Sequence, residues 1–338
     1  MKIANFLKKN TQLLIIIICV VAVLVLAACS VLVIFHKPPL EFEYKYSSEL
    51  GGVIVTKYTG TDIDVVIPSK IGKDPVVAIE GEYTRGVVNN EVRTVTIPDS
   101  AVYIGDFAFI NCDALTLITI PDTVVKIGSQ AFLGCRSLTS ITIPMNVTSI
   151  GTAAFNTCRS LTSITIPNNV PSLGFGMFAE CNSLTSITIP ESVISIGDSA
   201  FAGCSSLESI TIPDSVTSFG RAAFHDCSSL KSITLSNSLS DIEDYAFAHC
   251  ISLESVTIPN GITRIGYESF YCCSSLASVT IPDSVTSISY GAFMDCSALE
   301  SVMLPDSVTS IGNGAFTRCP LRSGQIKQRI RQINPEAL

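Results

Sequence analysis

The sequence predicts a repeat solenoid, a stack of similar turns in which each turn buries its apolar side chains only against its neighbours. The first observation is the pattern C-x-x-L-x-x-I-x-I-P, which recurs every 23 residues along the 338-residue chain. The second is a column of phenylalanines with the same step, from Phe109 to Phe316. A constant period of about 20–30 residues is typical of solenoids, which offer binding surfaces more often than catalytic pockets. The cysteines that mark the pattern are Cys112, Cys135, Cys158, Cys181, Cys204, Cys227, Cys250, Cys273, Cys296 and Cys319.

Residues 135–158 show how one turn is built. Residues 141–143 alternate Ile-Thr-Ile, which predicts a short strand with isoleucine inside and threonine outside. Pro144 ends that strand because proline cannot donate to a strand ladder. A second extended stretch is expected to end at Ile150, and Gly151 is expected in a turn that needs a positive φ. The strands of successive turns should stack in parallel, about 4.8 Å apart.

These residues are similar to a known family. The pattern C-x-S-L-x-S-I-T-I-P-x-S-V-T-S-I-G-x-x-A-F is almost intact in residues 204–224 and 273–293, and it resembles the BspA-like leucine-rich repeats of bacterial and protozoan surface proteins. The resemblance implies a leucine-rich repeat horseshoe with a parallel sheet on its concave face, roles in adhesion or host contact, and no shared catalytic residues. Residues 227–247 depart most from the pattern, with Ser236 for proline and Glu243 for glycine, so we expect local irregularity there.

The N-terminal residues form a separate segment. Residues 13–35 are uncharged and mostly apolar, which is long enough for a membrane span. Basic residues precede the span, so residues 1–12 are predicted to be cytoplasmic and the repeats extracytoplasmic on a single-pass signal anchor. Leu26-Ala27-Ala28-Cys29 also matches a lipobox, so a lipoprotein anchored at Cys29 is one alternative, and ordinary cleavage is another.

The remaining segments are predicted as caps around a repeat region at residues 92–319. Residues 38–91 lack a full repeat, although residues 65–68 and 76–79 imitate the two extended stretches of a turn. Terminal repeats are usually atypical because they must cover an exposed apolar end. Residues 320–338 follow the last cysteine, and the isoleucine spacing within residues 325–333 predicts a short amphipathic helix.

Charge argues against nucleic acid as a partner. Beyond residue 37 the chain has 17 basic and 29 acidic residues, a net charge of −12, whereas phosphate binding needs a basic surface. The sequence contains no nucleotide-binding loop and no C-x-x-C pair, and we predict neither a cofactor nor a catalytic residue.

The cysteines are predicted to be buried, reduced thiols. A residue at one repeat position points the same way in every turn, so the ten sulfurs should form a parallel column in the interior. Cys272 lies one place off that column and is expected to be the one exposed thiol beyond the membrane span.

Three residues at one repeat position are candidates for a catalytic or metal site. Asp226, His249 and Cys272 share a repeat position on consecutive turns. A thiol, an imidazole and a carboxylate together can activate a nucleophile or ligate a metal. Unrelated surface residues on an exposed turn are the preferred interpretation.

The candidate binding surface is the strand face. Its outward positions are rich in hydroxyl groups, and a flanking row changes from threonine to charged residues halfway along the chain. Solvated strand residues would show the same composition, because threonine favours strands. The alternative is a surface whose hydroxyl groups form hydrogen bonds with an extended ligand. This surface lacks the exposed tyrosine and arginine side chains that are typical of high-affinity contacts. The candidate residues are Thr162, Thr185, Glu208, Lys231, Glu254 and Glu300 in the flanking row, and Thr188, Thr211, Thr234 and Thr257 in the strand row.

Together these observations predict a membrane-anchored extracytoplasmic binding or adhesion module, with a protein or glycan ligand on the concave face. A surface scaffold without a specific ligand is the alternative. An enzyme or metal site based on the Asp226, His249 and Cys272 row is a third.

Overall fold

The computed structural model describes residues 41–338. The predicted span at residues 13–35 and the lipobox cysteine Cys29 lie outside the described residues. Within residues 41–338, no helix is both long enough and apolar enough to cross a membrane.

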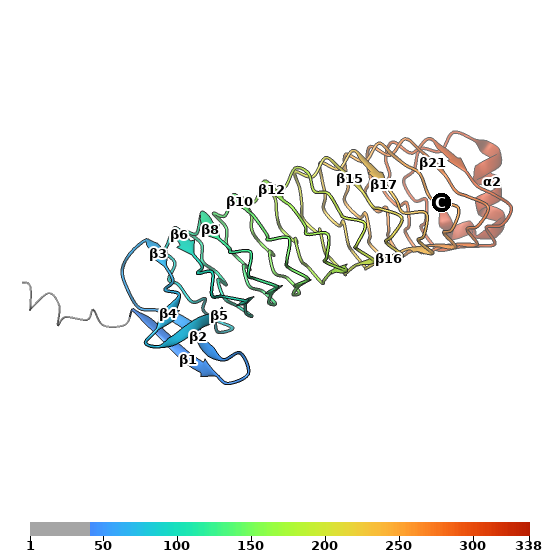
Figure 1. Cartoon of the computed structure of the whole chain (residues 1–338). Coiled ribbons are helices and arrows are strands. Elements are labelled where there is room, and N and C mark those ends of the chain that lie inside the picture. The colour runs from blue at the N-terminus through green and yellow to red at the C-terminus, as the bar shows by residue number, and fades with distance from the viewer. Residues whose placement is uncertain (1–40) are drawn as a thin grey trace, which may run out of the picture. The chain divides into compact units, whose positions relative to one another are not determined.

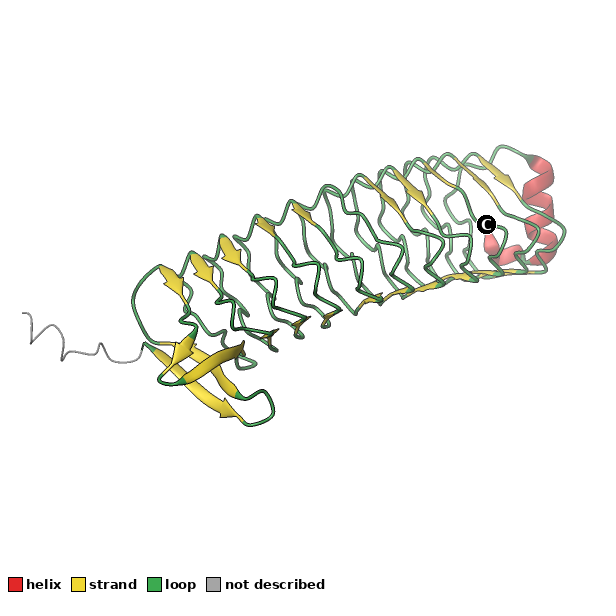
Figure 2. Ribbon diagram, viewed as in Figure 1, coloured by secondary structure: helices red, strands yellow, loops and turns green. Residues whose placement is uncertain are grey.

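Two columns of short parallel strands run along about eleven stacked turns (Figure 1). Figure 2 shows the two columns on opposite edges of the stack, joined by loops. The predicted solenoid is therefore confirmed. The first column contains β3 (Asp64–Val66), β6 (Thr94–Thr96), β8 (Leu117–Thr119), β10 (Ser140–Ile141), β12 (Ser163–Ile164), β15 (Ser209–Thr211), β17 (Ser232–Thr234), β19 (Ser255–Val256), β21 (Ser278–Thr280) and β23 (Ser301–Met303). The second column contains β5 (Asp74–Ile79), β7 (Tyr103–Ile104), β9 (Lys126–Ile127), β11 (Ser149–Ile150), β13 (Ser172–Leu173), β14 (Ser195–Ile196), β16 (Ser218–Phe219), β18 (Asp241–Ile242), β20 (Arg264–Ile265), β22 (Ser287–Ile288) and β24 (Ser310–Ile311).

The register of the strands follows the 23-residue period. Ser232 of β17 pairs with Ser255 of β19, and Ile265 of β20 pairs with Ile288 of β22. Residues at the same repeat position therefore stack directly on one another. Each position becomes a column of side chains, which is either entirely inside or entirely outside the stack.

The interior is a set of such columns. The ten phenylalanine rings from Phe109 to Phe316 are buried and stacked, with centroids of successive rings 5.2–5.7 Å apart. Beside them, the nine columnar thiols from Cys135 to Cys319, which exclude Cys272, each donate a hydrogen bond to the phenylalanine carbonyl of the preceding turn, at 3.0–3.2 Å. The eleven cysteines of the described residues are free thiols, as predicted.

Each turn closes on two residues in the left-handed backbone region. In one turn these residues are Tyr245 and His249, with φ values of 58° and 62°. The prediction that Gly151 needs a positive φ is wrong, because Gly151 is not among the residues with positive φ. A Cβ atom at Gly151 would instead lie 2.3 Å from the backbone nitrogen of Ser129, so glycine is needed there for the close approach of two turns.

The second strand column is interrupted at two departures from the repeat. Between β11 and β13 the second column breaks at Pro171, which has no N–H to continue the ladder. It breaks again between β16 and β18, in the turn where the sequence predicted irregularity. There Ser236 replaces proline, is fully buried, and donates to the Val216 carbonyl at 2.6 Å.

Both ends of the stack carry additional elements. At the N-terminal end, β1 (Phe42–Ser47) pairs antiparallel with β2 (Gly52–Tyr58), and β4 (Lys70–Ile71) pairs antiparallel with β5. The turn-like segments predicted at residues 65–68 and 76–79 correspond to β3 and β5, which pair in parallel with β6 and β7. At the C-terminal end, the predicted helix is α2 (Gly324–Ile333), with Ile330 buried, and η1 (Pro335–Ala337) follows it.

Candidate functional site

The outward side of the first strand column, here called the first face, brings the predicted binding residues together. The strand-row threonines Thr188, Thr211, Thr234 and Thr257 are all exposed. The flanking row is also exposed except for Glu300, which is half-buried. Because consecutive members are 23 residues apart and stack in register, the two rows lie side by side along the face.

The flanking row is held by contacts from turn to turn. The Thr162 hydroxyl donates to the Thr139 carbonyl at 3.1 Å. Further along, Lys231 Nζ donates to Glu208 Oε2 at 3.2 Å, and both side chains are more than half exposed. At the C-terminal end, Glu300 forms an ion pair with Arg322. The row therefore changes from neutral hydroxyl groups to an exposed alternation of acid and base.

The first face is hollowed near the point of this change. Residues 186–188 occupy the position of a first-column strand, but they form no strand between β12 and β15 within the described chain. A hollow of about 430 Å³ lies there, lined by Thr188, Thr211 and Glu191. Two of the predicted binding residues therefore share one recess. The recess could not be predicted from the sequence, because residues 186–189 are Ser-Ile-Thr-Ile, as in other turns.

The Asp226, His249 and Cys272 row is not brought together as a catalytic or metal constellation. The contact of Asp226 is with His225, whose Nδ1 lies 2.9 Å from Asp226 Oδ2. His249 packs against the rings of His225 and Tyr271 instead. No group of three His, Cys, Asp or Glu residues within residues 41–338 is placed to hold a metal ion.

The prediction that the columnar thiols are buried and that Cys272 alone is exposed needs one correction. The columnar cysteines are buried, and burial raises the pKa of Cys112 and of Cys158 to about 12. Cys319 is only half-buried because no further repeat turn covers it. Cys272 is also half-buried, and its thiol forms a hydrogen bond with Tyr271. The described chain therefore has two partly accessible thiols rather than the single exposed one that was predicted.

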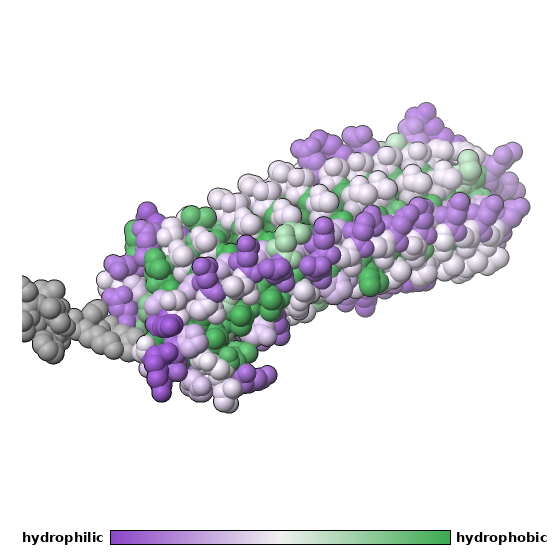
Figure 3. All heavy atoms as spheres, in the orientation of Figure 1, coloured by the Kyte–Doolittle hydropathy of each residue, from purple (hydrophilic) through white to green (hydrophobic). Residues whose placement is uncertain are grey.

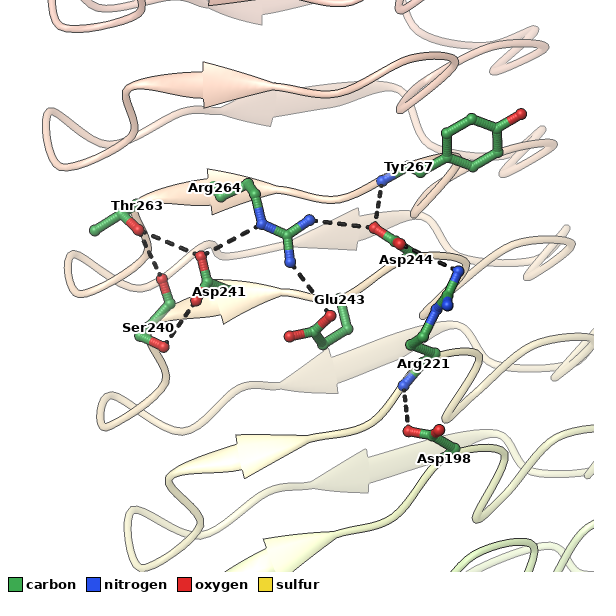
Figure 4. Close-up of polar contacts among 9 residues, drawn as sticks. All are labelled: Asp198, Arg221, Ser240, Asp241, Glu243, Asp244, Thr263, Arg264 and Tyr267. Atoms are coloured by element: carbon green, nitrogen blue, oxygen red, sulfur yellow. Dashed lines mark hydrogen bonds and ion pairs between the residues drawn. The ribbon is translucent and has the colours of Figure 1, made fainter.

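An ion-pair cluster on the second strand column was not predicted from the sequence. The Arg264 guanidinium contacts Asp241 at 3.7 Å, Glu243 at 3.2 Å and Asp244 at 3.1 Å (Figure 4). Partial burial alone would lower the pKa of Arg264, but the hydrogen bond with Asp244 and the nearby carboxylates raise it. The signal in the sequence was Asp241 and Arg264 at a position that is serine in most turns, with opposite charges one period apart.

Arg264 compensates for the acid that replaces glycine in this turn. Glu243 occupies the repeat position of Gly151, where two turns approach closely. The guanidinium of Arg264, in the next turn, neutralises the Glu243 carboxylate. Asp244 also contacts Arg221 at 3.3 Å and accepts from the backbone N–H of Tyr267 at 2.9 Å. These contacts hold the irregular turn in register, which is a structural role.

The wider surface is mostly of intermediate hydropathy. In Figure 3 the visible side of the stack is largely pale, the colour of serine and threonine, with lines of hydrophilic side chains along it. A second hollow, of about 670 Å³, lies near the N-terminal end and is lined by Arg85, Asn89, Asn90 and Glu91. Most of its lining residues belong to the loop at residues 84–91, which lacks repeat character, so sequence periodicity could not locate the hollow.

The geometry described above agrees with comparison to known proteins. The family model for the BspA type leucine rich repeat region matches residues 88–204, 173–297 and 219–338. The chain belongs to the BspA-type leucine-rich repeat family. The predicted resemblance is thereby confirmed, and it extends through the C-terminal segment. No curated protein sequence matches the chain.

Similar solved structures come from bacteria. A leucine-rich repeat protein from Eubacterium ventriosum has 22% identity and a TM-score of 0.50, covering 83% of this chain and 95% of that one. The pneumococcal vaccine antigen PcpA has 18% identity and a TM-score of 0.51, covering 84% and 85%. These two support the fold. A leucine-rich cell surface protein from Faecalibacterium prausnitzii has 28% identity and a TM-score of 0.38, covering 79% and 94%.

Proposed function

We propose that the chain is a membrane-anchored extracytoplasmic binding or adhesion module, whose first face holds a protein or glycan ligand. The apolar segment at residues 13–35 with its basic flank supports the anchor and the orientation. Membership of a family that the sequence resemblance links to surface adhesion supports the class of function. The repeats form columns of side chains without a catalytic constellation, which favours binding over catalysis.

One observation carries the choice of the first face. The recess at Thr188 and Thr211 lies beside the stretch where the flanking row becomes Glu208, Lys231 and Glu254. Threonine hydroxyls both donate and accept hydrogen bonds, while the charged row can fix the orientation of a polar ligand. An extended chain such as a glycan or a peptide strand can follow the turns and contact both rows.

Binding by the full-length chain to extracellular matrix proteins, glycans and cell-wall polymers tests this proposal. The informative variant changes Glu208, Lys231 and Glu254 to threonine, the residue at Thr162 and Thr185. We expect retention of the ligand to fall at least tenfold. The matched control is Thr139→Ala in the same row, which should change retention less than twofold. Retention unaffected by the triple variant would exclude the first face, and no retention of any probe would favour the scaffold alternative.

The proposed orientation has its own test. Protease added to intact cells should degrade the repeats of the full-length chain, because they are proposed to lie outside the cytoplasm. Complete protection, with digestion only after lysis, would reverse the topology.

A further inference from the structure

The third side of the stack consists of the residues that follow the second-column strand of each turn and precede the next cysteine. In the C-terminal half of the chain, this side carries aromatic rings. Four of the nine tyrosines and two of the three histidines of the chain lie on it within residues 225–290. We call them the tyrosine–histidine patch. Its members are His225, Tyr245, His249, Tyr267, Tyr271 and Tyr290.

The rings of the patch form two neighbouring lines. In the first line the centroids of Tyr245 and Tyr267 are 5.2 Å apart, and those of Tyr267 and Tyr290 are 5.1 Å apart. In the second line His249 lies 5.4 Å from His225 and 5.0 Å from Tyr271. Tyr290 is 42% exposed and the other rings are half-buried.

Glu268 lies between Tyr267 and Tyr271 in the chain and influences the pKa of both phenols. It forms a hydrogen bond with Tyr267, which raises the pKa of that phenol to about 12. The pKa of Tyr271 is also raised, first by its hydrogen bond with Cys272 and, among the smaller causes, by the charge of Glu268. The two lines run along the same turns, because Tyr245 and His249 belong to one turn and Tyr267 and Tyr271 to the next. Figure 4 shows the Tyr267 ring pointing away from the Arg264 cluster, so the patch borders that cluster without joining it.

Other turns of the stack close without these rings. The positions of Tyr267 and Tyr290 hold Ser129 and Thr152 in earlier turns, and the position of Tyr271 holds Ala202. The phenylalanine column beneath them is stacked in the same way in every turn. Tyr245 and His249 moreover occupy left-handed positions, where a bulky side chain costs conformational free energy that glycine avoids.

The chemistry of the patch fits a protein surface with basic side chains. Tyrosine supplies rigid contact area and a hydroxyl group, and it is enriched where protein interfaces bind most tightly. Asp226, Glu268 and Asp295 add carboxylates around the rings, and Arg318 is held by Asp295 at 2.9 Å. The net charge of −12 beyond residue 37 adds a long-range attraction for cations. A sugar ring fits less well, because the facing sides of Tyr267 and Tyr290 are already stacked on each other.

We propose that the tyrosine–histidine patch is a second interaction surface, separate from the first face, which binds a protein partner through a segment rich in lysine or arginine. The aromatic rings provide the contact area, and the partner's basic side chains pair with Asp226 and Glu268, whereas Asp295 is already paired with Arg318. This proposal does not depend on the ligand of the first face.

The test uses the full-length chain in nanodiscs and an immobilised library of synthetic 15-residue peptides, with basic sequences and acidic counterparts of the same aromatic content. The variant Tyr267→Ser/Tyr290→Thr installs the residues of Ser129 and Thr152 without altering charge. We expect retention on basic peptides to fall at least tenfold. The control Ser129→Ala/Thr152→Ala, at the same positions of earlier turns, should change it less than twofold.

Three results would overturn the proposal. Equal retention by wild type and the tyrosine variant would mean that basic peptides are attracted only by the general negative charge. Equal losses in variant and control would show that the effect is not local to the patch. Tyrosine-dependent retention on a glycan array, without tyrosine-dependent peptide binding, would identify a glycan surface instead. The variant Tyr267→Phe/Tyr290→Phe keeps the rings and should retain most of the binding, which guards against a loss caused by misfolding.

Discussion

The turns at residues 112–204 and those at residues 205–296 share one interior and differ on the surface. Both halves contain the same phenylalanine and cysteine columns, with ring centroids 5.2–5.7 Å apart throughout. On the outside, the earlier half presents mainly threonine, serine and alanine at positions where the later half presents charged residues, tyrosine and histidine. The difference separates positions that the stack requires from positions that are free to acquire a binding role.

The physical reason lies in what each position contacts. An interior side chain packs against the same position of the two adjacent turns, so a change in one turn disturbs both neighbours. An outward side chain contacts water and the surface of one or two turns. Departures from the repeat on the outside therefore cost little, and they mark where this chain differs from a plain solenoid.

The largest contrast is expected in thiol reactivity. Native alkylation should modify Cys272 and Cys319 at least about a hundredfold faster than the buried column, because buried thiols react only when the stack opens. Mass spectrometry of the labelled full-length chain measures this. Early labelling spread over Cys135, Cys204 and Cys250 would contradict the closed interior.

Alkaline pH should unfold the chain. The Cys112 and Cys158 thiols have a pKa of about 12 in the folded chain and an ordinary value of 9.0, so their contribution to stability is complete below pH 9 and is lost as the pH rises from 9 towards 12. Each such thiol lowers the free energy of unfolding by about 1.4 kcal/mol per pH unit in that window. Urea denaturation midpoints, measured with a reducing agent present, should fall steeply from pH 8 to pH 11. The midpoint of Cys158→Ala should fall less steeply over the same range. A pH-independent midpoint would contradict the prediction.

Removing one ring from the interior column should cost much of the stability. Phe201 is fully buried and stacks on Phe178 and Phe224, so Phe201→Ala should destabilise the fold by about 3–5 kcal/mol. Thr188→Ala on the first face should stay within about 0.5 kcal/mol of wild type. Similar denaturation midpoints for the two variants would mean that the inside and outside columns are wrongly assigned.

A smaller effect is expected at the ion-pair cluster. Arg264→Ser installs the residue of most other turns but leaves Asp241, Glu243 and Asp244 without their shared cation, so we expect a loss of about 1–2 kcal/mol. Adding Glu243→Gly should recover part of that loss, because it removes one of the stranded carboxylates. If the double variant is less stable than Arg264→Ser alone, Arg264 does not act as the counter-charge of Glu243.

Periodicity predicted the fold and the inside columns because both depend on one repeated unit. It could not predict the recess at Thr188 or the correct role of Gly151, because the local sequence at both places matches the other turns. Both features depend on the backbone geometry, which the repeat pattern does not specify. The Arg264 cluster and the tyrosine–histidine patch were visible as departures from the repeat, but single departures carried no meaning until the register placed Asp241 beside Arg264 and Tyr267 beside Tyr290.

The rings of the tyrosine–histidine patch, unlike the Arg264 cluster, are proposed to have no role in folding. Chemical denaturation of Tyr267→Ser/Tyr290→Thr tests this claim most directly, because both substitutions return a departing position to the residue of an earlier turn. We expect a free energy of unfolding within about 1 kcal/mol of wild type. A loss of about 3 kcal/mol or more, comparable to that of Phe201→Ala, would show that the tyrosines belong to the structural core and would contradict the separation of interior from surface.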